Sequence, residues 1–323
     1  MMQLYALDTS DSADSFSHTL AASLDVSLAA HEERHFEDGE RKLRPLSDPR
    51  GSDAYVVASL HGDTRLSPHD RLCRLLMFIA TLREHGAARV TAVVPYLAYA
   101  RKDRQTKAFD PLSSRYVAQL FEAVGTAQIM ALEVHNVAAF QNAFRCTSLH
   151  LEVHRIFDKL VTELAGEGPL AVASPDPGGV KRAQLWRESL EHRLQQTIGF
   201  AMLDKRRSTG IVSSENLVAG NVRQMSVLLL DDLIASGDTM KRAADALLTA
   251  GASQVIACAA HGLFTGAANE LLSDDCIAKV AVTDSVTPFR LPADASLRKK
   301  LHAVSAAPLF ALAIRASHHA WLR

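Results

Sequence analysis

The chain has 323 residues, of which 48% are hydrophobic and 22% are charged, so it is long enough for two domains and has ample apolar material for their cores. Its formal net charge of −1 argues against binding of nucleic acid through a global positive field. The four cysteines are scattered without a CxxC pair, which argues against a zinc site or a disulfide framework. No apolar run reaches membrane-spanning length, so we expect a cytoplasmic protein whose partners include neither a membrane nor a nucleic acid.

Strand and helix patterns alternate along the first half of the chain. Apolar runs at residues 55–59, 90–95 and 128–132 predict buried strands, and helical patterns occur at 70–85 and 113–124. A glycine stands directly after each of these helices, where helix C-termini commonly end. This order of elements is typical of an α/β domain.

The second half repeats the alternation and so predicts a second domain of similar design. Its predicted strands and helices are 170–174, 180–190, 198–203, 227–230, 241–250 and 254–260, followed by a short amphipathic helix at 307–314. Strands that alternate with helices imply parallel sheets joined by right-handed crossovers. We therefore predict domains at 1–150 and 151–323 with a ligand site between them, and a tail at 305–323 that could pack back on the N-terminal domain.

The segment at 227–239 is the most informative part of the chain. Its apolar residues at 227–230 fit a strand buried on both faces, so Asp231 and Asp232 are expected at the carboxyl end of that strand, where open α/β sheets bind ligands. There the two carboxylates can accept hydrogen bonds from vicinal sugar hydroxyls. The small turn that follows offers backbone N–H groups and hydroxyls to a phosphate at a helix N-terminus. This turn consists of Ala235, Ser236, Gly237, Asp238 and Thr239.

Together these features predict a site for ribose 5-phosphate. The segment resembles the phosphoribosyl diphosphate (PRPP) binding motif, which is shared by phosphoribosyltransferases and by the ribose-phosphate pyrophosphokinase (PRPP synthetase) family. The alternative interpretation is a buried strand followed by an acidic turn without special function, because short motifs also occur by chance. Further motifs are needed to decide between the two.

One segment of the first half, with Phe36, Asp38 and Glu40, resembles the loop with which that family receives the adenine of ATP. Taken alone, it is better explained as a surface turn around a glycine that needs a positive φ. The interpretation as an adenine loop therefore depends on the resemblance.

A second segment follows the strand predicted at 90–94 and contains Arg101, Lys102 and Asp103, which the resemblance assigns to ATP binding. Clustered cations at a strand end suit a triphosphate, because guanidinium groups hold phosphate oxygens in bidentate fashion. A solvated basic loop is the alternative.

Two segments resemble the family's metal-binding loops. His135, after the strand predicted at 128–132, matches a histidine that helps to coordinate the nucleotide's magnesium, although Mg²⁺ prefers oxygen ligands and a lone histidine is more often structural. Asp176 precedes Gly178 and Gly179, which let a metal-bound phosphate approach the backbone closely. We therefore expect Mg²⁺ as the cofactor, with Asp176 and His135 as ligands.

The segment after the strand predicted at 198–203 resembles the family's catalytic loop. In the family, a lysine and the arginine two residues later lie on a loop that closes over the reacting phosphates, and these positions are Lys205 and Arg207 here. The polar stretch at 208–221 has little periodicity and is predicted to be a mobile loop.

With these motifs in the family's order, the chain resembles ribose-phosphate pyrophosphokinases from about residue 36 to about residue 314. The resemblance implies two similar phosphoribosyltransferase-like domains, each a mostly parallel sheet flanked by helices. It implies transfer of the diphosphoryl group of ATP to ribose 5-phosphate, giving PRPP and AMP. It also implies a homo-oligomer, a dimer or a hexamer, in which the Phe36 loop completes the nucleotide pocket of a neighbouring subunit. Lys205, Arg207 and Arg101 supply the cations that such a transfer needs.

Ala235 and Asp238 depart from the family's motif, which usually has an acidic residue at the first position and a glycine at the second. If Asp238 pointed inward, its charge would oppose phosphate binding, whereas pointing outward it could cap the following helix. These departures motivate one alternative function, a non-catalytic regulatory subunit. The other alternative, a phosphoribosyltransferase, would need neither the Phe36 loop nor Lys205 and Arg207.

Overall fold

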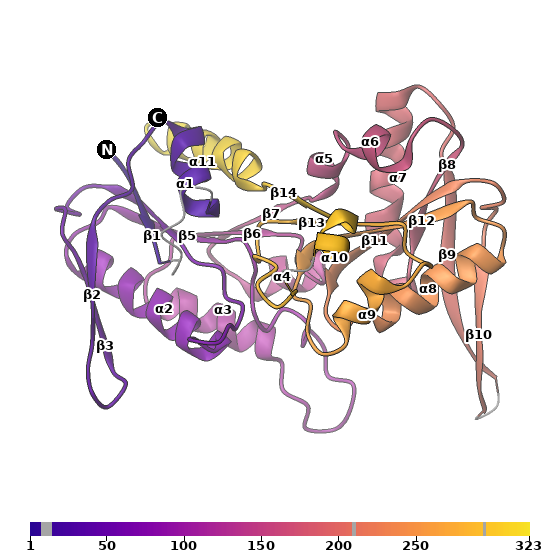
Figure 1. Ribbon diagram of the computed structural model, residues 1–323. Helices are drawn as coiled ribbons and strands as arrows, with labels where there is room; N and C mark the ends of the chain where they lie inside the picture. The colour runs from indigo at the N-terminus through magenta and orange to yellow at the C-terminus, as the bar shows by residue number, and fades with distance from the viewer. Residues whose placement is uncertain (8–14, 209–210, 293–294) are drawn as a thin grey trace. The chain divides into compact units, whose positions relative to one another are not determined.

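The computed structural model describes residues 1–7, 15–208, 211–292 and 295–323, and the chain forms two compact units. Unit 1 consists of Met1–Leu151 together with Ser305–Arg323, and unit 2 consists of Glu152–Val304. In Figure 1 unit 1 runs from indigo to magenta with its C-terminal helix in yellow, and unit 2 runs from pink to orange. Within the described ranges, no helix is long and apolar enough to cross a lipid bilayer.

Unit 1 is built on a five-stranded sheet in the order β1-β4-β5-β6-β7, in which all neighbouring strands are parallel. The strands are β1 (Met2–Ala6), β4 (Asp53–Val57), β5 (Arg89–Val94), β6 (Gln128–Leu132) and β7 (Thr147–Leu151). β4 and β6 are buried along their whole length, which explains why residues 54–57 and 129–132 are continuous apolar runs. β4 begins two residues before the predicted strand because it pairs with β1 from Asp53 onward.

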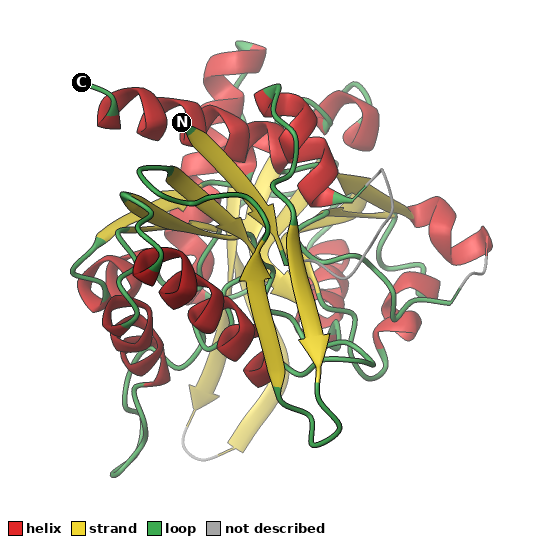
Figure 2. Cartoon of the chain, turned by 90° about the vertical axis from the view of Figure 1, so that its left-hand side faces the viewer, coloured by secondary structure: helices red, strands yellow, loops and turns green. Residues whose placement is uncertain are grey.

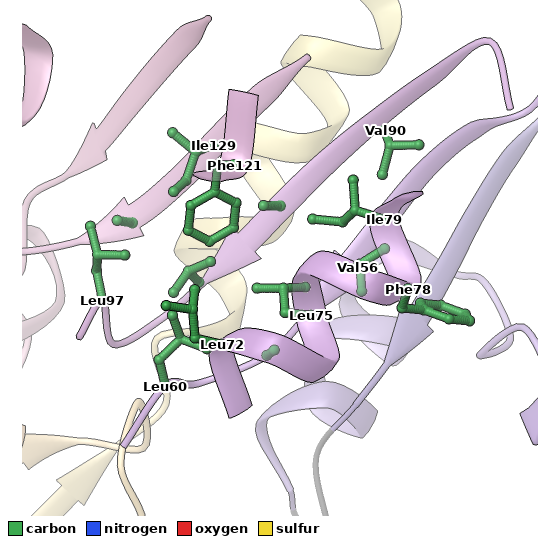
Figure 3. Close-up of a cluster of buried hydrophobic side chains, with 14 of the residues drawn as sticks. Val56, Leu60, Leu72, Leu75, Phe78, Ile79, Val90, Leu97, Phe121 and Ile129 are labelled. Carbon is green, nitrogen blue, oxygen red and sulfur yellow. The ribbon is translucent and has the colours of Figure 1, made fainter. Parts of the chain in front are cut away.

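Helices cover both faces of this sheet (Figure 1). α2 (Pro68–Glu84) and α3 (Ser113–Ala123) lie on one face, with α4 (Val137–Ala143) packed against α3, and α1 (Phe16–Leu24) and α11 (Ala307–Trp321) lie on the other. A capping box between Ser67 and Asp70 starts α2. Figure 3 shows the core beneath α2 and α3, which is formed by Val56, Leu60, Leu72, Leu75, Phe78, Ile79, Val90, Leu97, Phe121 and Ile129.

The C-terminal helix α11 belongs to unit 1 although more than 150 residues separate it from the rest of that unit. The ring of Phe310 meets that of Phe16 on α1 edge to face, with 5.4 Å between their centroids. Asp53 is completely buried and accepts hydrogen bonds from Arg89 Nε and Nη2 at 2.7 Å, while His318 Nδ1 lies 2.6 Å from its Oδ2. A buried carboxylate is stable only when it is paired, so this contact stabilises the docking of α11.

An antiparallel hairpin also belongs to unit 1 and lies at the front of Figure 2. It consists of β2 (His31–His35) and β3 (Arg41–Pro45), with His35 paired to Arg41 at the end next to the turn. Its side chains are mostly exposed or half-buried, so it contributes little to the core. The turn at 36–40 contains the predicted adenine loop.

Unit 2 has a seven-stranded sheet in the order β10-β9-β8-β11-β12-β13-β14, in which only β10 runs antiparallel to its neighbour. The strands are β8 (Leu170–Ser174), β9 (Gly199–Ser208), β10 (Ile211–Ala219), β11 (Ser226–Ile234), β12 (Gln254–Gly262), β13 (Lys279–Thr283) and β14 (Leu301–Val304). Parallel neighbours bring the carboxyl ends of β8, β11 and β12 to one edge, as expected for strands that alternate with helices.

The prediction of a mobile loop at 208–221 is wrong for most of that stretch, because Ile211–Ala219 forms β10. β10 pairs with β9 in a register that shifts between Val212 and Asn216. This irregularity interrupts the alternation of apolar and polar residues, which explains why the sequence pattern did not reveal a strand. Residues 209 and 210 lie outside the described ranges.

Helices cover both faces of the unit 2 sheet as well (Figure 1). α5 (His154–Phe157), α6 (Val161–Ala165) and α7 (Val180–Leu194) lie on one face, and α8 (Asp238–Thr249) and α9 (Ala268–Ser273) lie on the other, with α10 (Ala295–Lys300) next to α9. The strong apolar face of α8 packs its buried residues on the sheet: Met240, Ala243, Ala244 and Leu247.

Candidate functional site

The predicted triphosphate loop of unit 1 follows β5 and is linked to the loop after the neighbouring strand β6. Asn136 Nδ2 donates to Asp103 Oδ2 at 2.7 Å, and Lys102 Nζ donates to Asp110 Oδ2 at 2.6 Å. Arg101 is exposed, and it makes no ion pair with any other described residue. Of the two adjacent cations, Arg101 is therefore the more readily available for an anionic ligand.

A tyrosine fixes the start of this loop. Tyr99 has a φ of 65°, a left-handed conformation that is uncommon for a residue with a bulky side chain. Its hydroxyl forms a short hydrogen bond with Nδ1 of His69 in the first turn of α2, and the two rings lie 5.6 Å apart. Neither residue was singled out as a site residue from the sequence, because the contact joins positions 30 residues apart.

The predicted adenine loop is the turn of the β2–β3 hairpin. Phe36 N donates to Glu40 O at 2.9 Å, and Glu40 N donates to Asp38 Oδ1 at 3.0 Å, while Gly39 adopts a φ of +93°. Phe36 is 40% exposed, with the Arg34 guanidinium 5.1 Å from the centroid of its ring. Asp38 and Glu40 are exposed. The turn thus presents an aromatic ring and two carboxylates to solvent.

An ion pair that the sequence analysis missed holds this hairpin on α2. Arg74 Nε donates to Glu33 Oε1 at 2.8 Å, and Arg41 Nη1 donates to the same oxygen at 2.9 Å. Burial by itself would raise the pKa of Glu33, but the hydrogen bonds from Arg74 and Arg41 outweigh it and lower that pKa. An arginine in a helical sequence does not by itself identify its partner, so the sequence carried no signal for this ion pair.

The predicted metal ligand of unit 1, His135, is exposed on the loop after β6. The preceding Glu133 is 4% exposed, and Asn136 caps α4 by accepting a hydrogen bond from Ala139 N at 3.1 Å. His135 therefore lies between the buried Glu133 and the capping residue Asn136, and Asn136 also donates a hydrogen bond to Asp103.

The predicted metal ligand of unit 2, Asp176, lies at the carboxyl end of β8. Its Oδ1 accepts a hydrogen bond from Gly179 N at 3.1 Å, and its backbone carbonyl accepts one from Ser174 Oγ at 2.6 Å. A Cβ at Gly179 would lie 2.6 Å from Ser174 Oγ, so the tight turn excludes any side chain there. The other carboxylate oxygen of Asp176, Oδ2, takes part in neither of these two hydrogen bonds.

Asp231 and Asp232 lie inside β11 and do not follow it, which corrects the expectation that they emerge beyond the strand end. β11 remains paired with β12 as far as Ile234↔Gly262, because β12 is equally long. Its pairing with β8 ends at Leu229↔Ala173, so on that side Asp231 extends past its neighbour.

Arg182 on α7 faces Asp231, with its Nη1 3.7 Å from Asp231 Oδ1. Burial, followed by the charge of Asp232, raises the pKa of Asp231 well above its ordinary value, and Arg182 only partly opposes this effect. The same Nη1 lies 3.5 Å from the position that a Cβ of Gly179 would occupy. Arg182 therefore joins the Asp176 turn to Asp231, a contact that the sequence alone did not reveal.

The predicted phosphate turn has an unexpected internal contact. α8 begins at Asp238, three residues before the predicted helix, and Gly237 precedes it with a φ of +88°. Ser236 Oγ donates to Asp238 Oδ2 at 2.7 Å, and Asp238 is exposed. Thr265 N donates to Ala235 O at 2.9 Å, which fixes the base of the turn from the loop after β12. Thr239 lies half-buried in the first turn of α8.

The backbone of Lys205 and Arg207 lies in β9, where these residues pair with Asn216 and Val212 of β10. Their side chains lie outside the part of the chain that the structure describes. Within that part, no group of three or more His, Cys, Asp or Glu side chains is arranged to hold a metal ion by itself.

Comparisons with known proteins agree on one family. The model of the N-terminal domain of ribose phosphate pyrophosphokinase matches residues 5–125, and that of the phosphoribosyl transferase domain matches residues 147–290. Ribose-phosphate pyrophosphokinase from Caldanaerobacter subterraneus subsp. tengcongensis is 34% identical over 310 residues, covering 96% of this chain and 93% of the relative. That from Hyphomonas neptunium is 33% identical over 299 residues, covering 93% and 92%.

A solved structure agrees as well. The crystal structure of phosphoribosylpyrophosphate synthetase from Mycobacterium smegmatis is 30% identical and superposes with a TM-score of 0.84, covering 98% of this chain and 99% of that one. These matches confirm the predicted α/β fold of two phosphoribosyltransferase-type units with mostly parallel sheets flanked by helices.

Proposed function

The chain belongs to the ribose-phosphate pyrophosphokinase family, and from this membership we propose that it transfers the β,γ-diphosphoryl group of ATP to ribose 5-phosphate. The anomeric oxygen of the sugar forms a bond to the β-phosphorus, and the bond from that phosphorus to the oxygen bridging the α-phosphate breaks. AMP leaves with the bridging oxygen, and the hydroxyl proton is released. The products are PRPP and AMP.

The observation that carries this proposal is the polar arrangement on the neighbouring strands β8 and β11. Asp176 follows β8 in a tight turn that leaves no room for a side chain at Gly179, and Arg182 reaches from that turn to Asp231 on β11. Carboxylates beside a narrow backbone turn suit a sugar with vicinal hydroxyls and a phosphate. A buried strand with an acidic turn of no function would not require this linkage.

In unit 2, Asp231 and Asp232 would accept hydrogen bonds from the ribose hydroxyls. The turn from Ala235 to Thr239 would hold the 5-phosphate through backbone N–H groups at the start of α8 and through hydroxyls. In unit 1, Arg101 and Lys102 would bind phosphates of ATP, while the exposed ring of Phe36 would stack on its base. Asp38, Glu40 and Asp103 would orient the nucleotide through hydrogen bonds.

Lys205 and Arg207 would stabilise the charge that develops on the oxygens of the transferred group. Such a transfer needs in-line placement and electrostatic stabilisation more than a covalent nucleophile. Both positions belong to β9, the strand beside β8, and that placement of the backbone is consistent with a role near Asp176.

The residues fit Mg²⁺ as the cofactor. Mg²⁺ usually takes one or two carboxylates and completes its coordination with water and substrate phosphates, so it needs no cluster of protein ligands. Asp176 would hold it in unit 2, where one carboxylate oxygen lies outside the Gly179 hydrogen bond, and His135 is the ligand that the resemblance suggests in unit 1. The bound ion would supply neutralisation of phosphate charge.

The reaction is tested by incubating the full chain with ATP, Mg²⁺ and ribose 5-phosphate and measuring AMP and PRPP. We expect both products in equal amounts, and no AMP when either the sugar phosphate or Mg²⁺ is omitted. Failure to form AMP at any Mg²⁺ concentration would contradict the proposal and favour the regulatory-subunit alternative. PRPP consumption with a nucleobase would favour a phosphoribosyltransferase instead.

We also propose that the chain forms a homo-oligomer, a dimer or a hexamer, in which the Phe36 turn meets a second copy. The exposure of the turn supports this proposal, because the Phe36 ring and the carboxylates of Asp38 and Glu40 are accessible to a second copy. Light scattering coupled to gel filtration would give the mass directly. A monomer at micromolar concentration would contradict it.

A further inference from the structure

The contact between Ser236 and Asp238 is a feature that the proposed reaction does not need. The hydroxyl of Ser236 donates to Asp238 Oδ2 at 2.7 Å, within the turn that would hold the sugar phosphate. Gly237 between them has a φ of +88°, which brings the two side chains together at the start of α8. A hydroxyl that would otherwise donate to the phosphate is therefore engaged by a carboxylate of the same turn.

Asp238 also uses the electrostatic advantage of the helix start. The N-terminus of α8 carries a partial positive charge, and its capping residue Gly237 offers no side-chain hydrogen bond. Asp238 is the acidic residue in this first turn, where a negative charge is stabilised. Its carboxylate thus has the two interactions, a hydroxyl donor and a helix N-terminus, that favour a bound phosphate.

We propose that the Asp238 carboxylate is a built-in competitor for the 5-phosphate of the sugar, which occupies the Ser236 hydroxyl until the phosphate displaces it. This inference rests on the proposed function. It makes Asp238 a determinant of affinity for the sugar phosphate and sets the concentration at which the enzyme becomes saturated. It also assigns the Asp238 side chain a role against binding, although this residue belongs to the turn that is predicted to hold the phosphate.

The size of the effect follows from charge and distance. A unit charge and a dianion at roughly 5 Å in a water-like dielectric repel by an energy that corresponds to roughly tenfold in affinity. The exposure of Asp238 keeps the dielectric high, so a much larger effect is not expected. Salt should reduce the effect further.

The test compares Asp238→Gly and Asp238→Asn with the wild-type chain. We expect Asp238→Gly to lower the KM for ribose 5-phosphate roughly tenfold, and to tighten the binding of inorganic phosphate measured by titration calorimetry to a similar extent. Asp238→Asn removes the charge but retains an oxygen that can accept from Ser236, so its KM should lie between the two. Asp245→Asn, which removes an exposed charge farther along α8, serves as the matched control, and the KM for ATP is the internal reference.

A second comparison isolates the hydroxyl. Ser236→Ala should cost little affinity for ribose 5-phosphate in the wild-type chain, because Asp238 already engages that hydroxyl, and several-fold more in the Asp238→Gly background. If Ser236→Ala weakened binding of ribose 5-phosphate equally in the wild-type and Asp238→Gly chains, the proposed competition would be overturned. An Asp238→Asn variant with a raised KM for ribose 5-phosphate would also overturn it, because the carboxylate would then contribute to binding.

Failure of this inference can be distinguished from failure of the proposed function. A wild-type chain that forms AMP, but whose KM for ribose 5-phosphate equals that of both Asp238 variants, overturns the inference alone. A wild-type chain that neither forms AMP nor binds ribose 5-phosphate overturns the proposed function and the inference with it.

Discussion

The two units carry charge at the carboxyl edges of their sheets in opposite ways. In unit 1 the charged groups lie on loops and a hairpin turn, where Arg101 is exposed and Lys102 is paired with the half-buried Asp110. In unit 2 the carboxylates lie within a strand, where the side chain of Asp231 is 18% exposed and Asp232 is 4% exposed. Apart from the buried Glu133, the charges named here at the edge of the unit 1 sheet are therefore largely solvated, whereas those of β11 in unit 2 are desolvated.

From this difference we expect function and stability to be coupled in unit 2 more strongly than in unit 1. A solvated charge can be removed with little effect on folding, whereas a desolvated carboxylate is kept at a cost in stability that its function must justify. We therefore expect substitutions in unit 1 to change mainly nucleotide affinity, and substitutions in unit 2 to change turnover, stability or both.

The largest effect is expected for Lys205→Ala in unit 2. Its charge is needed mainly in the transition state, so kcat should fall by roughly a thousandfold while the KM for ATP changes little. Steady-state measurement of AMP formation tests this, with the exposed Lys299→Ala as the control variant. Near-normal turnover of Lys205→Ala would remove the catalytic role from this residue.

Asp231→Asn should separate function from stability. Loss of the charged acceptor for a ribose hydroxyl should lower kcat/KM for ribose 5-phosphate by about 10- to 100-fold. Because the pKa of Asp231 is raised, ionisation of its carboxyl group lowers the free energy of unfolding once the pH exceeds the ordinary value of 3.8. The variant should therefore unfold at a higher temperature than the wild type at pH 7, and the difference should shrink as the pH falls towards 3.8. A lower unfolding temperature at pH 7 would argue against a desolvated carboxylate.

Phe36→Ala tests the expectation for unit 1. Stacking of an aromatic ring on a base is worth about 1–3 kcal/mol, so the KM for ATP should rise roughly tenfold, with a smaller change in kcat. Phe109→Ala, which removes a fully exposed ring elsewhere in unit 1, provides the control. A fall in kcat without a change in the KM for ATP would contradict the expectation that substitutions in unit 1 change mainly nucleotide affinity.

The smallest effect is expected for Asp110→Asn. The hydrogen bond from Lys102, followed by those from Thr106, lowers the pKa of Asp110, so its ionised form stabilises the folded chain above the ordinary value of 3.8. The variant should unfold at a slightly lower temperature at pH 7, opposite in sign to Asp231→Asn. This contribution is lost as the pH falls through the lowered pKa. Thermal unfolding of both variants in one buffer series checks the sign.

Local patterns predicted much of the fold because they depend on neighbouring residues. Buried strands such as β6 are recognisable as apolar runs, and the turn after Asp176 is recognisable from its paired glycines, Gly178 and Gly179. β10 was missed because its bulge breaks the alternation on which strand prediction depends. The site residues were named from motifs, and their roles remain predictions.

The sequence by itself determined the central alternation of buried strands and helices in each half, the turn chemistry and the family, since all of these are written in residue types at short spacing. Only the tertiary structure decided the partners of charged groups: Arg182 with Asp231, Arg74 with Glu33, and Asp53 with Arg89 and His318. It also decided that Ser236 donates to Asp238, through the left-handed turn at Gly237. The physical reason is that a charge can be paired by any opposite charge that folding brings within reach, and this depends on the geometry of the whole unit.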